Sequence, residues 1–191
     1  DIQVHLQKIA VKEGIKYEDD ALYLIAQKAD GALRDALSIF DRLSTFSQKN
    51  ITLAKAAEVL NVLDYEQYLS IVDLAQENKI SETLFALNGI IKKGFDPHIF
   101  IAGLGSHFRD LMMAQNPQTV SLIEVGEKTK IKFLEQSKKW NAQQLVDAIE
   151  ICNHADINYK NSKNPRLTVE IALMQLSSLS ANTADSKKKS I

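Results

Sequence analysis

Hydrophobic positions recur at spacings of three and four along nearly the whole chain, which predicts helices from end to end. In residues 2–13 such a stripe runs from Ile2 to Ala10, and Gly14 then ends the helix. A second helix begins with the acidic residues 18–20 and ends at Asp30-Gly31. Two more are expected over 32–46 and 53–62, the last with Thr52 as N-cap. Together they predict a small helical bundle over residues 1–63.

The second part of the chain carries longer helices. Asp64, Ser81, Asp96-Pro97 and Asn141 are typical residues for helix starts. The expected helices are 65–77, 82–93, 97–114, a short one at 118–125, then 127–139, 142–161 and 166–179. The sequence therefore predicts an all-α fold with a larger helical bundle over 64–179. Residues 180–191 are polar and predict a disordered tail or linker.

Composition narrows the class of protein. Seven Gly and three Pro in 191 residues are too few turn formers for a many-stranded β fold. The net charge is −1, with acids and bases interspersed, so neither part carries the charge of an autonomous nucleic-acid binder. The single cysteine, Cys152, excludes an internal disulfide and predicts a buried thiol in a reducing, cytoplasmic setting. Because the chain starts at Asp1, directly before a helical pattern, we expect a piece of a longer protein.

Sequence patterns for catalysis and metal binding are absent. The chain has no G-x-x-x-x-G-K-[S/T] and no G-x-G-x-x-G to cradle phosphates. Its four histidines have no metal-ligand spacing, and Cys152, although it lies two residues before His154, forms no recognised nucleophile pattern with it. We therefore expect no catalytic residue and no metal site within this chain.

One segment, Gly31–Ser38 (G-A-L-R-D-A-L-S), has an unusual charge arrangement. Gly31 turns the chain into the next helix, and Leu33 and Leu37 are expected to anchor that helix in the bundle. Arg34 then lies in the first turn, where the helix dipole disfavours a cation. A bound anion would resolve this, because Arg beside a helix N-terminus makes a good phosphate site. The alternative is a surface arginine that faces Asp30, Asp35 or solvent.

The segment G-A-L-R-D-A-L-S resembles the sensor-2 motif of AAA+ ATPases, in the form found in clamp loaders. The longer stretch Ala29–Leu43 and the stretch N-P-R-L at 164–167 resemble the bacterial DNA polymerase III gamma/tau family. The resemblance covers roughly residues 1–180. It implies a sensor-2 lid domain over 1–63 and a helical collar domain over 64–179.

The resemblance also implies roles for individual residues. Arg34 would reach the phosphates of bound ATP, and Leu33 and Ala32 would flank the nucleotide. Gly31, Asp35, Pro165 and Arg166 would be structural parts of the two motifs. ATP and Mg²⁺ would belong to a longer parent protein, the ATPase subunit of the DNA polymerase holoenzyme. Without an ATPase domain, we expect this chain to hydrolyse no ATP and to bind it weakly.

The resemblance implies partners as well: other clamp-loader subunits through the collar, and the sliding clamp and primed DNA in the full assembly. Candidate assembly surfaces are the helices 97–114, 142–161 and 166–179. The apolar triplet 111–113 could face a partner or lie in the core. Five lysines between residues 128 and 139 could form a solvated helix face or contact DNA; they are Lys128, Lys130, Lys132, Lys138 and Lys139. Trp140, which follows them, is expected to anchor the bundle.

Other functions remain open at this point. The chain could be the lid and C-terminal helical domain of another AAA+ ATPase that acts in DNA recombination or repair. One such family follows the lid with a winged helix, which needs a β-hairpin that the sequence does not show after residue 63. A clamp-loader subunit that does not hydrolyse ATP would often lack the sensor-2 pattern. A helical scaffold unrelated to ATPases would make the match at 31–38 a coincidence.

Overall fold

The computed structural model describes the backbone of residues 2–188 and the side chains of residues 2–180. The chain forms two compact units. Unit 1 comprises residues 1–64 together with 124–131, and unit 2 comprises residues 65–123 and 132–191. Eight residues from the middle of the second part of the chain therefore pack with the first.

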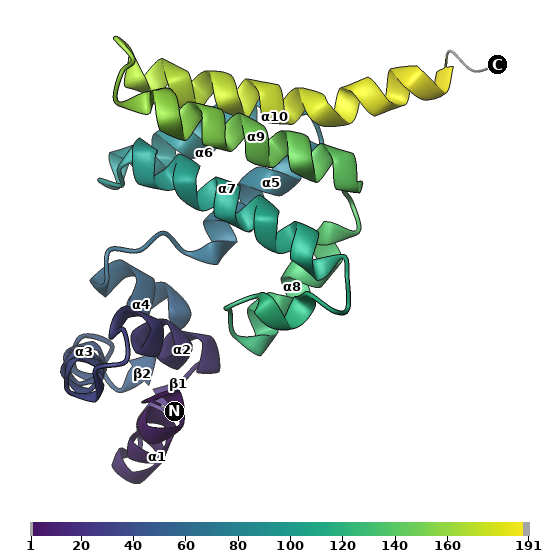
Figure 1. Cartoon of the computed structure of the whole chain (residues 1–191). Helices are drawn as coiled ribbons and strands as arrows, with labels where there is room; N and C mark the ends of the chain where they lie inside the picture. The colour runs from purple at the N-terminus through teal and green to yellow at the C-terminus, as the bar shows by residue number, and fades with distance from the viewer. Residues whose placement is uncertain (1, 189–191) are drawn as a thin grey trace. The chain divides into compact units, whose positions relative to one another are not determined.

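Within unit 1, residues 2–64 form four helices and a pair of two-residue strands, and the start of α8 (Glu127–Ser137) belongs to the same unit (Figure 1). In chain order these are α1 Ile2–Glu13, β1 Lys16–Tyr17, α2 Asp19–Lys28, α3 Leu33–Phe46, β2 Asn50–Ile51 and α4 Leu53–Val59. The helices bury one apolar stripe each, including Leu6, Ile25 and Leu43, which are fully buried in one shared core. The helical bundle expected for this part of the chain is thus present.

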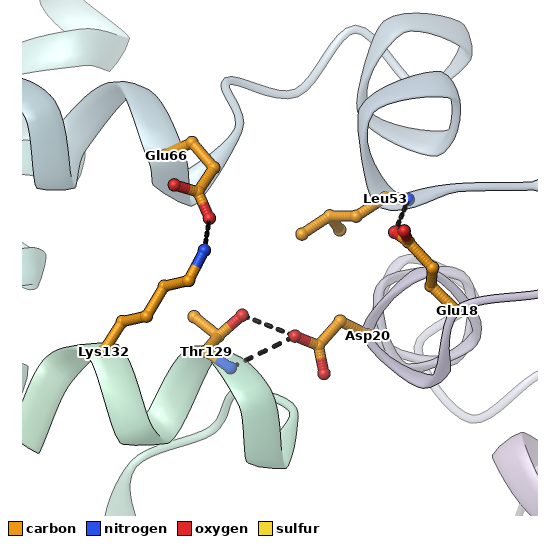
Figure 2. A network of polar contacts seen from close by, with 6 residues as sticks. All are labelled: Glu18, Asp20, Leu53, Glu66, Thr129 and Lys132. Atoms are coloured by element: carbon orange, nitrogen blue, oxygen red, sulfur yellow. Dashed lines mark hydrogen bonds and ion pairs between the residues drawn. The ribbon is translucent and has the colours of Figure 1, made fainter.

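The strands β1 and β2 pair in parallel, with Lys16 opposite Asn50 and Tyr17 opposite Ile51. The sequence does not predict this pairing, because two residues are too few to show an alternating pattern. Glu18 follows β1 and accepts a hydrogen bond at Oε2 from the Leu53 backbone N–H at 2.7 Å (Figure 2). This carboxylate satisfies an amide at the start of α4 and so joins two segments 35 residues apart.

Unit 2 is helical. Its elements are α5 Tyr65–Gln76, α6 Ile80–Lys92, α7 Pro97–Ala114, the 3₁₀ turn Val120–Leu122, α8 Glu127–Ser137, α9 Ala142–Tyr159 and α10 Pro165–Lys188. The first residues of α8 are those that pack with unit 1. The long helix α9 packs against both α7 and α10 (Figure 1). The all-α fold class is confirmed, with the β1–β2 pair as the strand content of the described residues.

Helix starts agree with the sequence where a side chain caps the backbone. Asp96 accepts from the His98 N–H at 2.8 Å, and Pro97 is the first residue of α7. Asn141 and Gln144 form a reciprocal capping box at α9. The prediction of Ser81 as an N-cap is wrong. Because Asn78 takes a left-handed backbone conformation (φ 55°), the chain turns earlier and α6 begins at Ile80.

The last helix is longer than the sequence predicts. We expected a helix over 166–179 and a disordered tail or linker over 180–191, whereas α10 continues to Lys188. Residues 181–188 include no Gly or Pro, so polarity ends the apolar stripe but does not break the backbone ladder. The remaining residues, 189–191, lie outside the described part of the chain.

Two glycines should respond to alanine with opposite signs. Gly31 has a φ of +82°, where a Cβ is strained although no atom lies within 4 Å of its position. Gly89 lies within α6, also with open space around its Cβ position. We expect Gly31→Ala to lower the stability of unit 1 by about 1 kcal/mol and Gly89→Ala to raise that of unit 2 by about 0.5–1 kcal/mol. Amide hydrogen exchange measures each unit separately, and an equal sign for both variants would contradict this prediction.

Candidate functional site

The candidate site is the N-terminal turn of α3. Asp30 and Gly31 both have positive φ (46° and 82°), and they turn the chain from α2 into α3. Ala32 is the N-cap and has no side chain that accepts a hydrogen bond. Its carbonyl accepts from the Ala36 N–H at 3.1 Å, which begins the helical ladder. Within the described residues, the N–H groups of residues 33–35 therefore have no protein acceptor.

Arg34 lies on this turn with its side chain exposed. It makes no hydrogen bond or ion pair with any residue that the structure describes, Asp30 and Asp35 included. Ala32 and Asp35 are exposed as well. Backbone donors, the positive end of a helix and an unpaired guanidinium thus occur together on an open surface. This arrangement suits an oxyanion such as a phosphate.

Leu33 is placed differently from our expectation. The sequence predicts Leu33 and Leu37 as anchors in the bundle, but Leu33 is 42% exposed and Leu37 is only half-buried. The buried stripe of α3 consists of Ala36, Phe40 and Leu43. Leu33 falls on the same side of the helix, but it is the first helical residue, one turn before Ala36, where that buried stripe begins. Its apolar surface is consequently available to a ligand.

The N-P-R-L stretch forms the start of α10. The Asn164 side chain accepts from the Leu167 N–H at 3.2 Å, and Pro165 occupies the first helical position. Arg166 Nε pairs with Glu170 Oε1 at 2.8 Å, and its Nη2 donates to Asn88 Oδ1 of α6 at 3.4 Å. The structure therefore gives this stretch a structural role, in starting α10 and tying it to α6.

The lysine cluster is largely neutralised. Lys130 pairs with Glu127 at 3.0 Å, Lys139 with Asp73 at 2.7 Å, and Lys132 with Glu66 (Figure 2). Lys128 and Lys138 have no partner among the described residues. Paired lysines at a helix surface present little net charge to a polyanion. These pairs favour the interpretation of a solvated helix face.

The remaining candidates divide between core and surface. Leu111 and Trp140 are buried, whereas Met112 and Met113 are half-buried. Cys152 is buried, and burial raises the pKa of its thiol, so it is an unreactive core residue. Exposed apolar side chains occur along the three helices expected to assemble; they are Ile99, Val146, Ile157, Leu167 and Ile171. A groove of about 350 Å³ lies between α9 and α10 and includes Ile171 and His154 in its lining.

No metal centre is evident in the part of the chain that the structure describes, because no three His, Cys, Asp or Glu side chains come together there. Among the same residues, no helix is both long and apolar enough to span a bilayer.

Comparisons with known proteins define the class. Residues 1–49 match the family model of the ATPase lid domain of the DNA polymerase III clamp loader subunit. Residues 51–189 match the model of domain III of DNA polymerase III subunits gamma and tau. The class is therefore a clamp-loader lid followed by a helical domain, in the same order as the two units begin along the chain. The chain belongs to the DNA polymerase III gamma/tau family, which confirms the resemblance seen in its sequence.

Individual relatives agree with this assignment. The chain is 28% identical over 181 residues to the DNA polymerase III subunit tau of Bacillus subtilis, covering 94% of this chain and 32% of that protein. It is 29% identical over 184 residues to the protein STICHEL-like 2 of Arabidopsis thaliana, covering 96% and 21%. The chain thus spans about a fifth to a third of the length of these relatives.

A solved structure shows the same fold. The delta protein of the Bacillus subtilis DNA clamp loader superposes with a TM-score of 0.59, over 92% of this chain and 55% of that one. Since the two sequences are 19% identical, the likeness concerns the fold.

Proposed function

We propose that this chain supplies the nucleotide-sensing lid and the ring-assembly collar of a clamp-loader motor subunit. In that role it couples ATP binding to the loading of the sliding clamp on primed DNA during replication, in the cytoplasm. Membership of the gamma/tau family supports the proposal. The observation that carries it is the exposed Arg34 on an N-terminal turn, where neither its guanidinium nor the backbone N–H groups have a partner among the described residues.

Arg34 is proposed as the residue that contacts the phosphates of ATP. A guanidinium can neutralise charge on the γ-phosphate, and an interaction made only with the triphosphate links nucleotide state to lid position. Leu33 and Ala32 flank the nucleotide, which agrees with their exposure. The phosphate-cradling loop and the ligands of Mg²⁺ are assigned to a separate ATPase domain of the parent protein.

The collar is proposed to bind other clamp-loader subunits by helix packing. The exposed apolar residues of α7, α9 and α10 support this role, because removing them from water favours association. DNA and the sliding clamp are partners of the whole assembly. We do not assign a DNA contact to the lysine cluster, since three of its five members pair with carboxylates.

Arg34→Gln tests the site directly in this chain. We expect ATP, titrated at low salt and followed by NMR, to shift the amide signals of residues 32–36 with a dissociation constant in the millimolar range. One exposed charge-assisted contact contributes about 1 kcal/mol, so Arg34→Gln should weaken binding roughly fivefold. Arg42 of α3 is also exposed and has no partner in the part of the chain that the structure describes, and Arg42→Gln removes the same charge as a control.

Two outcomes would contradict the assignment. One is an ATP titration that shifts no signal in residues 32–36. The other is equal weakening by Arg34→Gln and Arg42→Gln, which would mean that the nucleotide responds to net charge alone.

A further inference from the structure

Residues 124–131 are held in unit 1 by a carboxylate from α2. Asp20 is 8% exposed, and its Oδ2 accepts from the Thr129 N–H at 3.2 Å and from the Thr129 hydroxyl at 2.6 Å. Figure 2 shows the Asp20 side chain pointing at the first turn of α8, which carries Thr129. The two residues lie 109 positions apart in the sequence.

Asp20 takes the place of an N-cap side chain for α8. The Gly126 carbonyl accepts the first helical hydrogen bond, from Lys130 N–H at 2.9 Å, so Gly126 is the N-cap residue and Thr129 is the third helical residue. An N-cap side chain normally accepts from the second or third helical N–H. Gly126 has no side chain, and a Cβ there would lie 2.5 Å from Asp20 Cγ. The glycine therefore admits a carboxylate from another helix.

This attachment lies outside the apolar core cluster of unit 1, and it combines the polar contact with Asp20 and the burial of the Val125 side chain, which is 5% exposed. The core cluster and the partly buried residues packed on it fall within residues 2–62, and residues 124–131 contribute no side chain to it. Asp20 Oδ1 is buried without a hydrogen-bond partner among the described residues, so desolvation of the carboxylate is incompletely offset. Tyr23 lies one turn along α2, near Glu124. The pKa of its phenol is raised mainly by burial and to a smaller extent by the Glu124 carboxylate.

We propose that residues 124–131 form a releasable strap, which docks on unit 1 through Asp20 and can detach while the core of unit 1 stays folded. With the strap docked, the chain passes between the two units three times, after residues 64, 123 and 131. With the strap released, one passage remains. The strap therefore determines whether one or three chain segments connect unit 1 to unit 2.

Amide hydrogen exchange on the whole 191-residue chain, without nucleotide, tests the strap independently of the proposed function. In Asp20→Ala we expect the amides of Thr129, Lys130 and Ile131 to exchange at least tenfold faster. Amides in α1, α3 and α4 should change less than twofold. Asp19→Ala removes the same charge from the adjacent exposed residue and should leave the strap amides unchanged. Thr129→Val removes only the hydroxyl donor and should accelerate the same amides severalfold, whereas Thr129→Ser should restore protection.

The results separate the strap from an integral part of the fold. If Asp20→Ala accelerates exchange across α1, α3 and α4 as much as in residues 129–131, the segment is part of the core and the proposal is overturned. Unchanged strap amides in both Asp20→Ala and Thr129→Val would show that this carboxylate does not hold the segment.

Discussion

Lowering the pH from 6.5 to 4 is expected to remove roughly 3 kcal/mol from the unfolding free energy of unit 2 through His107 alone. His107 is 3% exposed on α7, among the rings of Tyr68, Phe108 and Phe133. Burial lowers its pKa to about 4, against smaller opposing effects of a hydrogen bond with Gln136 and the Asp73 carboxylate.

Burial disfavours the charged form because the second ring nitrogen of His107 has no acceptor among the described residues. Gln136 Nε2 donates to the Leu69 carbonyl at 2.8 Å, so Gln136 Oε1 faces His107 Nε2 at 2.7 Å and accepts a hydrogen bond from its N–H. His107 Nδ1 is then the unprotonated nitrogen, buried with no partner in the described residues. A second proton would have to sit on Nδ1, as a charged donor without an acceptor.

The sign of the effect follows from the two states. The unfolded chain takes up the proton as the pH falls below 6.5, whereas the folded chain resists it down to about 4. The contribution of His107 is therefore complete above pH 6.5 and is lost as the pH falls through about 4. Urea unfolding monitored between pH 7 and 4 measures it. His107→Gln, which cannot titrate but can still donate to Gln136, should have a flatter pH profile than the parent chain. Equal slopes would refute the prediction.

Gly103→Ala is expected to lower the stability of unit 2 by about 3 kcal/mol or more. Gly103 lies on α7 beside the ring of Tyr68 on α5, and a Cβ there would be 2.7 Å from Tyr68 Cζ and closer still to its hydroxyl oxygen. The ring cannot easily move, because it is buried and stacked on Phe100 with a centroid distance of 5.8 Å. The added methyl group must therefore force the backbone of α7 and the Tyr68 ring of α5 apart.

Neighbouring glycines provide graded controls. A Cβ at Gly105 would lie 3.1 Å from Cys152 Cβ, so Gly105→Ala should cost about 1 kcal/mol, and Gly89→Ala should stabilise. In a double-mutant cycle, Tyr68→Leu should relieve part of the cost of Gly103→Ala. Denaturant unfolding of the four single variants and of the Gly103→Ala/Tyr68→Leu double variant checks the order. A Gly103→Ala protein as stable as the Gly105→Ala protein would show that α5 adapts to the methyl group.

Local patterns carried most of the fold prediction. The Asp96-Pro97 and Asn141 signals gave the correct starts of α7 and α9, because the capping side chain and the capped amide lie within three residues of each other. Ser81 failed as a cap because the left-handed turn at Asn78 decided where α6 begins. The sequence analysis does not predict the burial of His107, because a single histidine carries no local signal for burial.

The candidate site also has features that the local sequence predicts and features that it does not. Arg34 could be singled out from sequence because its helix position and its motif are local. Its role as a nucleotide contact stays a prediction, supported by its exposure and by the lack of a partner among the residues that the structure describes. The contacts of Glu18 with α4 and of Asp20 with α8 could not be predicted, because carboxylates are frequent in the chain and the partner residues are distant in sequence.

The position of the strap has a consequence for synthesis on the ribosome. The apolar core of unit 1 is complete once residues 2–62 have emerged, but the strap is translated only after residues 65–123. At an elongation rate of about 5–20 residues per second, the Asp20 carboxylate has no partner for a time on the order of several seconds. During that interval its carboxylate stays hydrated, and the α2 surface around it is open to chaperones and to the wrong helix N-terminus. The eight residues of the strap cover this surface only after α8 has formed.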